Sequence, residues 1–176
     1  MGLPEKIVAI HESLETARIA HAFGGALALA WCTKRARGTI DIDLNVFVDP
    51  DSAEIVFASL PDGIVWSAQD LESVHSDGQV RLWWDTTPVD IFLNTTGFHR
   101  EVANRARSEL FMGQEVPFLS CTDLAVFKAF FNRTKDWADI EEMIAAGTLD
   151  VERVVGVLVT YLGNTDERVD RLLGLI

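Results

Sequence analysis

The stretch that decides the fold reads Phe23-Gly24-Gly25 and, after fifteen further residues, Asp41-Ile42-Asp43-Leu44. A glycine pair between a strand and a helix lets the backbone approach a phosphate without a Cβ clash. The first N–H groups of such a helix point at the anion. Two aspartates at positions i and i+2 of a strand point to the same face, and two carboxylates on one face suit a hard cation such as Mg²⁺. The stretch therefore predicts a phosphate turn next to a metal-binding strand.

The residues around this stretch predict a sheet crossed by helices. Residues 19–23 are short and apolar, as a buried strand is, and residues 39–48 alternate between apolar and polar side chains. The apolar face of the second strand would consist of Ile40, Ile42, Leu44 and Val46. Asp51 and Glu54 resemble a capping box that starts a helix. Other strands are expected at residues 64–67, 79–85 and 89–93, and helices at residues 5–17, 26–31 and 51–60.

From about residue 97 the pattern becomes helical. Ser120 and Asp123 have the spacing of a capping box before an apolar run. Helices are expected at residues 98–110, 124–132, 137–146, 151–162 and 167–175. The sequence therefore predicts an α+β protein with an N-terminal sheet module, residues 1–97, and a helical C-terminal subdomain, residues 98–176, packed on it.

Asp90, within the strand-like segment Pro88-Val89-Asp90-Ile91-Phe92, supplies a third carboxylate. A phosphate turn together with these three carboxylates suggests metal-dependent nucleotidyl transfer. In that reaction, charge builds on the attacking and leaving oxygens, and two metal ions can stabilise both. Asp41 and Asp43 would share the ions. Asp90 would complete the acceptor-side metal and help to deprotonate the nucleophile. The expected cofactor is Mg²⁺, as two ions, with Mn²⁺ as an alternative.

The ordered motifs resemble the polymerase-β-like nucleotidyltransferase superfamily, most of all the bacterial AbiEii-type and small nucleotidyltransferase group. The resemblance rests on Gly24 to Ala30, Arg37 to Leu44, Val89-Asp90-Ile91 and the later segments Asp123 to Lys128 and Arg133 to Ile140. It implies that the sheet module has the polymerase-β-like fold and that Gly24 and Gly25 bind the nucleotide, with ATP as a donor. It also implies that Lys128 contacts the triphosphate.

Three further residues have supporting roles in this interpretation. The resemblance makes Asp136 catalytic or a residue that holds the site together, while Arg37 and Thr39 would help to shape the metal strand. An AbiEii-like toxin would modify RNA and need an antitoxin protein, whereas a resistance-type enzyme would modify a small hydroxylated molecule. A third alternative is a non-catalytic, nucleotide-binding relative, favoured by Ala26, which stands where some members carry a hydroxyl residue.

Charge and composition limit the partners. Acidic residues outnumber basic ones, 27 to 15, and the formal net charge is −12. Because proteins that hold long nucleic acids usually present a basic patch, duplex DNA is an unlikely partner, and a small acceptor is favoured over RNA. No apolar run approaches a membrane helix, and the N-terminus does not resemble a signal peptide. A cytoplasmic protein is expected, with Cys32 and Cys121 as buried thiols.

Each candidate also has a plain structural interpretation. Asp41 and Asp43 could be solvent-facing strand residues, Asp90 could be a charge on an edge strand, and the glycine pair could be an ordinary tight turn. Lys128 could be a surface lysine lying over aromatic rings.

The supporting residues and the adjacent tryptophans have such interpretations too. Asp136 could be a helix N-cap, Arg37 a solvated loop charge and Thr39 an ordinary β-former. Core packing is the favoured interpretation of Trp83-Trp84, because adjacent strand residues face opposite sides and at most one can join a given site.

Overall fold

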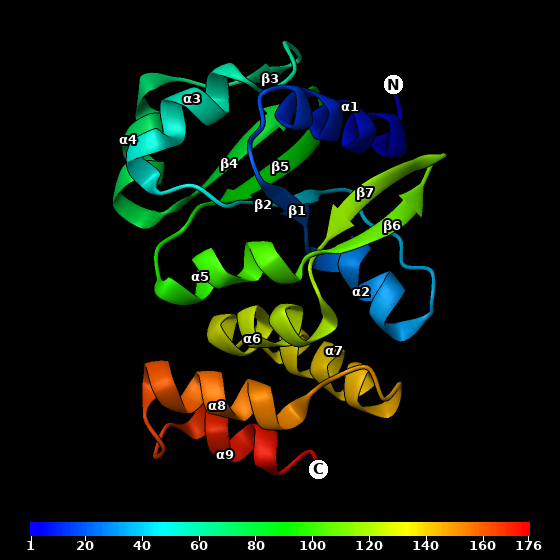
Figure 1. Cartoon of the computed structure of the whole chain (residues 1–176), viewed down its shortest axis with the longest axis vertical. Helices are drawn as coiled ribbons and strands as arrows, with labels where there is room; N and C mark the ends of the chain where they lie inside the picture. The colour runs from blue at the N-terminus through cyan, green and yellow to red at the C-terminus, as the bar shows by residue number, and fades with distance from the viewer. The chain divides into compact units, whose positions relative to one another are not determined.

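The glycine pair lies where the sequence predicts it, between strand β1 (His21–Phe23) and helix α2 (Gly25–Thr33). The structure, a computed structural model, describes all 176 residues (Figure 1). Strand β2 (Ile42–Val46) runs antiparallel to β1, with Phe23 opposite Leu44. The turn and the aspartate strand are therefore neighbours in the sheet.

The sheet has seven strands in the order β3-β4-β5-β2-β1-β7-β6. Strands β2 and β5 are parallel, as are β1 and β7, and the remaining neighbours are antiparallel. The strands not yet introduced are β3 (Ile64–Val65), β4 (Gln79–Trp84), β5 (Thr87–Phe92), β6 (Arg107–Phe111) and β7 (Gln114–Phe118). The aspartate strand β2 thus lies in the middle of the sheet, between β5 and β1.

The chain forms two compact units, the first consisting of Met1–Leu27 with Gly38–Leu119 and the second of Ala28–Arg37 with Ser120–Ile176. The first holds the whole sheet with helices α1 (Leu3–Thr16), α3 (Ala53–Ala58), α4 (Ala68–Asp77) and α5 (Gly97–Val102). Short 3₁₀ turns occupy Pro50–Ser52 and Ala103–Arg105. The expected boundary at residue 97 lies inside this first unit, because the β6–β7 hairpin joins the sheet.

The core of the first unit forms where apolar residues recur at helical and strand spacing. Ile7, Ile10 and Leu14 on α1 are fully buried, as are Leu44 and Ile91 in the middle of the sheet. The amphipathic pattern of the N-terminal segment is thus confirmed as a helix that buries one face.

The second unit contains helices α6 (Cys121–Phe131), α7 (Thr134–Ala145), α8 (Val151–Leu162) and α9 (Glu167–Leu173). These confirm the four helices expected after residue 120. Ser120 accepts a hydrogen bond from the backbone N–H of Asp123, 3.1 Å between heavy atoms, as the predicted cap requires. None of the helices in the protein has the length and apolar character that crossing a bilayer requires.

The expected helix at residues 98–110 is wrong. Helix α5 ends at Val102, and residues 107–118 instead form the β6–β7 hairpin, closed through Gly113 with φ of +83°. Arg107-Ser108-Glu109-Leu110-Phe111 does not alternate between polar and apolar residues, so its sequence has no strand period, and pairing with β7 decides its structure.

Other local expectations also need correction. Helix α4 was not expected, although Ser67 and Asp70 form its complete capping box. The expected box at Asp51 and Glu54 is absent, because a 3₁₀ turn precedes α3 and its N-cap makes no side-chain hydrogen bond. The aspartate strand is shorter than expected, and Ile40 lies outside it, 80% exposed.

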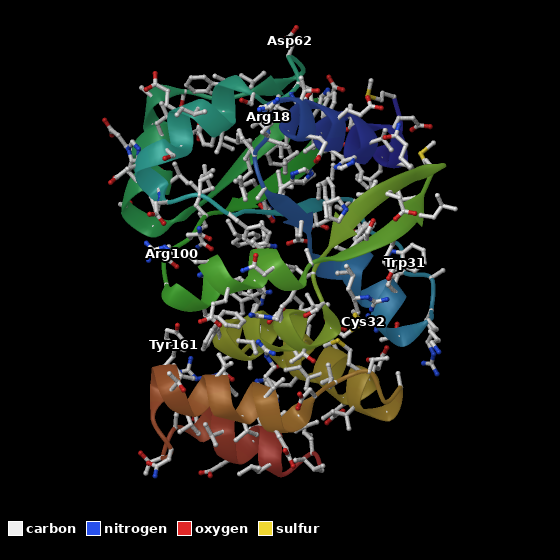
Figure 2. All side chains as sticks on the ribbon, viewed as in Figure 1. Arg18, Trp31, Cys32, Asp62, Arg100 and Tyr161 are labelled. Carbon is white, nitrogen blue, oxygen red and sulfur yellow. A yellow bond between two sulfur atoms is a disulfide. The ribbon has the colours of Figure 1, made fainter.

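The expectation of two free thiols is also wrong. Cys32 and Cys121 form a disulfide with Cα atoms 5.5 Å apart (Figure 2 labels Cys32). Both residues are buried, as expected. A spacing of 89 residues contains no signal of contact; the bond forms because folding brings the end of α2 to the start of α6 within the second unit.

Candidate functional site

The glycine turn lies directly against the carboxylate of Asp43. Gly25 has φ of +52°, a conformation that L side chains rarely adopt, and a Cβ added to it would lie 1.7 Å from Asp43 Oδ2. The backbone N–H of Gly24 donates a hydrogen bond to the Asp43 carbonyl oxygen, 2.8 Å away. Only glycine fits at position 25, because any side chain would displace this carboxylate.

The hydroxyl group of Thr39 holds Asp41 in place. Thr39 Oγ1 donates a hydrogen bond to Asp41 Oδ1, 2.5 Å away, and the backbone N–H of Asp41 donates to Thr39 Oγ1 at 3.4 Å. Asp41 precedes β2 and Asp43 lies within it, and both are half-buried. The structure therefore gives Thr39 a specific contact with the aspartate pair, which an ordinary β-former would not need.

Asp90 lies next to Asp43 across the sheet. The two are register partners on the parallel strands β5 and β2, so their side chains leave the same face of the sheet. Strand β5 is internal, between β4 and β2, and the interpretation of Asp90 as an edge-strand charge is therefore wrong. Asp43 and Asp90 thus come from adjacent strands, and Asp41 lies directly before β2.

Arg81 on β4 pairs with Asp90 from the other side. Its Nε donates to Asp90 Oδ1 and its Nη2 to Asp90 Oδ2, each at 2.7 Å. This bidentate pair raises the pKa of Arg81, and the nearby charges of Asp41 and Asp43 raise it further. Arg81 is therefore permanently charged and lies in the field of all three carboxylates.

The carboxylate oxygens of this face are suitable ligands for a hard cation, although both oxygens of Asp90 already accept hydrogen bonds from Arg81. Carboxylate oxygens are the ligands that Mg²⁺ prefers, and Mg²⁺ usually takes one or two of them together with phosphate oxygens. The structure contains no group of three or more His, Cys, Asp or Glu side chains placed to hold a metal ion. Asp41 and Asp43 could serve a magnesium ion together with substrate oxygens, and Asp90 would first have to loosen its pair with Arg81.

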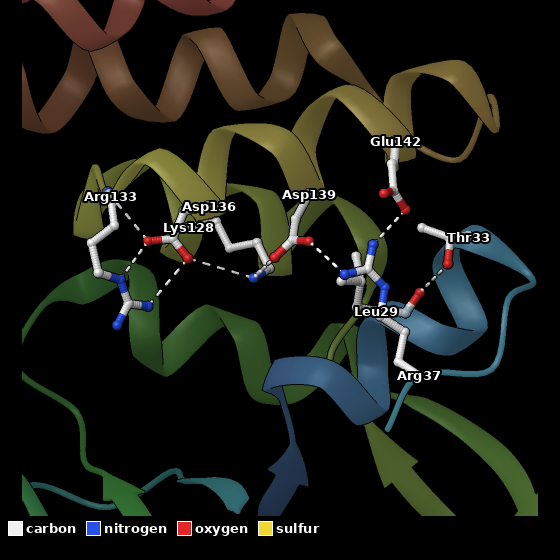
Figure 3. A network of polar contacts seen from close by, with 8 residues as sticks. All are labelled: Leu29, Thr33, Arg37, Lys128, Arg133, Asp136, Asp139 and Glu142. Carbon is white, nitrogen blue, oxygen red and sulfur yellow. Dashed lines mark hydrogen bonds and ion pairs between the residues drawn. The ribbon is translucent and has the colours of Figure 1, made fainter. Parts of the chain in front are cut away.

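The second unit brings together a different set of predicted residues, shown in Figure 3. Lys128 is 8% exposed, and its Nζ lies 2.7 Å from Asp139 Oδ2 and 3.5 Å from Asp136 Oδ1. Arg37 pairs with Asp139 at 3.1 Å and with Glu142 at 2.5 Å. Lys128 is therefore not a surface lysine, and Arg37 is not a solvated loop charge.

Asp136 ends this chain of charges. It is fully buried at the third position of α7, not at the N-cap, and Arg133 donates to it from Nε at 2.6 Å and from Nη2 at 3.1 Å. Burial by itself raises the pKa of Asp136, but the hydrogen bonds and charge of Arg133, together with the charge of Lys128, hold that pKa below its ordinary value. Asp136 therefore stays ionised and links two cations.

The predicted site residues thus divide between the units. The first unit holds Gly24, Gly25, Thr39, Asp41, Asp43 and Asp90, and the second holds Arg37, Lys128 and Asp136. Sequence reasoning missed Arg81. A signal existed: strands 79–84 and 87–92 flank the two-residue turn Asp85-Thr86, and pairing outward from that turn places Arg81 opposite Asp90.

Two open depressions of the first unit lie away from the carboxylates. One, of about 450 Å³, is lined by residues of α1 together with Ser59 and Pro61. The other, of about 410 Å³, includes Asn94, whose Oδ1 atom is buried without a hydrogen-bond partner. Neither contains Asp41, Asp43 or Asp90, so neither depression is the site of the predicted carboxylates.

Comparison with solved structures identifies the fold. Over 89% of this chain and 94% of that one, the protein matches ANT(2")-Ia in complex with adenylyl-2"-tobramycin, with a TM-score of 0.61 and 14% identity. A nucleotidyltransferase-like antigenic protein from Paracoccidioides brasiliensis matches with a TM-score of 0.55 and 15% identity, over 96% and 92% of the two chains. The lincomycin-bound lincosamide adenylyltransferase LnuA matches with a TM-score of 0.54 and 14% identity, over 81% and 96%.

These matches show that the α+β architecture is that of nucleotidyltransferase-like proteins, as predicted. No family model matches the sequence, and comparison with curated proteins gives no match. The matched structures bear on the fold alone, and the AbiEii-type subgroup receives no support from them.

Proposed function

We propose that this protein transfers a nucleoside monophosphate from a nucleoside triphosphate to a hydroxyl or amine of a small acceptor. The observation that carries the proposal is the arrangement of three adjacent strands. The glycine turn follows β1, Asp43 lies beside it on β2, and Asp90 is the register partner of Asp43 on β5. The glycine turn and acids from two strands thereby meet in the middle of the sheet, as the resemblance implies for this chemistry.

Asp41, Asp43 and Asp90 are proposed as both the catalytic and the metal-binding residues, with two Mg²⁺ ions as the expected cofactor. When bound, such ions neutralise the charge that builds on the phosphate and on the attacking and leaving oxygens. Thr39 holds Asp41 through its 2.5 Å hydrogen bond. Arg81 orients Asp90 through its two hydrogen bonds until substrate arrives.

The glycine turn would receive the phosphates of the donor nucleotide. Gly25 lets the Asp43 carboxylate lie directly against the turn, and the N-terminus of α2 would direct its first N–H groups and the positive end of the helix dipole at the phosphates. The N–H of Gly24 is already used by Asp43. Ala26 adds no hydroxyl, so backbone groups alone would bind the phosphates at this position.

The reaction balances without a further co-reactant. The acceptor oxygen or nitrogen forms a bond to the α-phosphorus of the triphosphate, and the bond from that phosphorus to the bridging oxygen of pyrophosphate breaks. The proton of the acceptor passes to the Asp90 carboxylate and then to solvent. Asp90 is suited to this because it lies on the side of the aspartate pair away from the glycine turn.

A small molecule is the proposed acceptor, with ATP as the proposed donor. One matched protein is a lincosamide antibiotic adenylyltransferase with lincomycin bound, and another is in complex with an adenylylated tobramycin. The net charge of −12 disfavours a long nucleic acid. An RNA acceptor and an antitoxin partner remain predictions of the AbiEii resemblance, and growth arrest on expression would revive them.

Lys128, Arg37 and Asp136 take a supporting role in this proposal. The ammonium group of Lys128 is buried and held by two carboxylates, so its direct contact with a triphosphate, implied by the resemblance, would require breaking these ion pairs. We propose that the network orders α6 and α7 and fixes Arg37 at the end of the segment that follows α2.

The test is transfer of radiolabel from α-labelled ATP to a panel of neutral and cationic ring alcohols and amines that includes lincomycin and tobramycin. The double variant Asp41→Asn/Asp43→Asn is expected to lose activity by about a thousandfold or more, because the neutral amides cannot replace the charge of the carboxylates. Its thermal unfolding should match the wild type, since Asn preserves shape. Equal activity of the double variant would contradict the proposal.

A non-catalytic, nucleotide-binding relative is the alternative outcome. Calorimetry with ATP and Mg²⁺ would then show binding in the wild type, with no labelled product from any acceptor of the panel. Failure of both binding and transfer would mean that the face is not a nucleotide site.

A further inference from the structure

We propose that the exposed face of β4 and β3 beside Asp90 is the acceptor subsite, and that Trp83 is the platform on which a ring of the acceptor lies. The proposal rests on the proposed function, because it assigns the second substrate to a place on the same face. It concerns Trp83 and Val65, neither of which has a role in the chemistry described so far.

The order of the strands indicates the side from which the acceptor approaches the aspartates. From one side to the other, the face carries the glycine turn after β1, Asp43 on β2, Asp90 on β5, Arg81 on β4 and then the edge strand β3. If the donor phosphates lie at the glycine turn, the attacking group must approach from the opposite side of the aspartates, because an in-line displacement separates the attacking and leaving oxygens. The acceptor therefore lies over β4 and β3.

Trp83 lies on this face next to the acids. It is two residues after Arg81 on the same strand, so both side chains point the same way. Trp83 is 49% exposed, whereas its neighbours Leu82 and Trp84 are buried on the other face. The expectation that both tryptophans pack in the core holds for Trp84 and is wrong for Trp83.

Val65 extends the apolar surface outward from Trp83. The two residues are register partners on the antiparallel strands β3 and β4, and Val65 is 74% exposed. Side chains of directly opposite residues lie within contact distance. Trp83 and Val65 therefore form an apolar strip on the same face that reaches the edge of the sheet, two residues along the strands from the row of Asp43, Asp90 and Arg81.

The chemistry of the strip selects the occupant. An indole face stacks on flat or apolar ring faces and attracts positive charge, and the acids beside it, together with the net charge of −12, repel anions. The acceptor is therefore a small, ring-containing molecule without an anionic group, which places a hydroxyl or amine at Asp90 and a ring on Trp83.

The kinetic test compares Trp83→Ala and Trp83→Phe with the control Trp66→Ala. Trp66 follows Val65 and packs on Phe57, with ring centroids 5.5 Å apart, and it is 37% exposed. Trp83→Ala should raise the KM for the acceptor by about tenfold, from the loss of stacking, with the KM for ATP unchanged. Trp83→Phe should keep most of the affinity, and Trp66→Ala should leave the acceptor KM at the wild-type value.

A second measurement needs neither metal nor turnover. The five tryptophans are labelled with 5-fluorotryptophan, the Trp83 signal is assigned by its disappearance in Trp83→Phe, and each compound of the acceptor panel is titrated by fluorine NMR. The Trp83 signal should shift in a saturable way with compounds that are also acceptors, and the Trp66 signal should not. Thermal unfolding of each variant separates a binding defect from a folding defect.

The outcomes keep the two proposals apart. Transfer activity with an unchanged acceptor KM in Trp83→Ala, or panel compounds that never shift the Trp83 signal, would overturn the acceptor subsite and leave the proposed function standing. If neither the wild type nor the variants transferred a nucleotide from any labelled triphosphate, this result would instead contradict the proposed function.

Discussion

The two units of this protein use the same charged residue types in opposite ways. In the helical unit, Lys128 and Asp136 are buried and linked with Arg133, Asp139 and Arg37 in a continuous chain of ion pairs. On the sheet, three half-buried carboxylates gather on an open face around the bidentate pair of Arg81 and Asp90. Charges buried with their partners mainly specify structure, whereas acids that reach solvent together retain the capacity to bind a cation. This contrast favours the sheet face as the site of chemistry.

Gly25→Ala should have the largest effect on the open face of the sheet. The added Cβ would lie 1.7 Å from Asp43 Oδ2 at a residue with φ of +52°, so the carboxylate must move and the turn is strained. We expect about a hundredfold loss of transfer activity, because small displacements at an active site are costly, and a loss of about 1–2 kcal/mol in the free energy of unfolding.

The matched control for this prediction is Gly156→Ala. Gly156 lies within α8, and a Cβ added there meets nothing within 4 Å. The Gly156→Ala variant should keep full activity, and its free energy of unfolding should increase by up to about 1 kcal/mol, because alanine favours a helix. If Gly25→Ala retained wild-type activity, the turn would not be part of the site. Activity assays and urea denaturation of both variants provide the comparison.

Lys128→Met tests whether the buried region is structural. Removing the ammonium group leaves Asp136 and Asp139 without one of their partners, and breaking a buried pair by removing one member costs about 3 kcal/mol or more. We expect this loss in urea denaturation, with activity per folded molecule close to wild type.

Lys135→Met is the control for that variant, since Lys135 is exposed on the neighbouring helix α7 of the same unit and should change the free energy of unfolding by less than about 0.5 kcal/mol. A stable Lys128→Met protein with a strongly raised KM for ATP would assign Lys128 to the phosphate site instead, as the family resemblance implies.

A buried pair of histidines gives the smallest of the expected effects. His11 Nδ1 and His21 Nε2 lie 3.0 Å apart, and one ring donates a hydrogen bond to the other. Burial lowers the pKa of His21 below its ordinary 6.5. The unfolded chain therefore binds more protons as the pH falls through about 6.5, so stability should fall below that pH.

The slope due to His21 cannot exceed about 1.4 kcal/mol per pH unit. Thermal unfolding between pH 8 and pH 5 would measure it, and His21→Gln should flatten the curve in this range. A curve that is equally steep in His21→Gln would place the effect elsewhere. The pKa of His99 is lowered to about 4 by burial, so His99 adds a loss of the same sign and His99→Gln is the companion variant.

Much of the sheet unit could be predicted because its signals are local. The glycine pair and the alternation of residues 42–46 each depend on neighbouring residues in the chain. The β6–β7 hairpin was misassigned because five-residue strands and short helices share apolar residues, and pairing with a distant strand decides between them. Of the candidate site residues, Asp41, Asp43 and Asp90 could be proposed from residue type and context, whereas Arg81 required the register of β4.

The sequence by itself determined which acids could act together and where the backbone needs glycine, because strand alternation and the absence of a Cβ are properties of the chain. Only the tertiary structure decided that Asp90 pairs with Arg81, that Lys128 is neutralised by Asp136 and Asp139, and that Cys32 bonds to Cys121. The reason is physical: the cost of burying a charge and the distance between two groups depend on everything packed around them. The period and composition of the sequence do not contain that information.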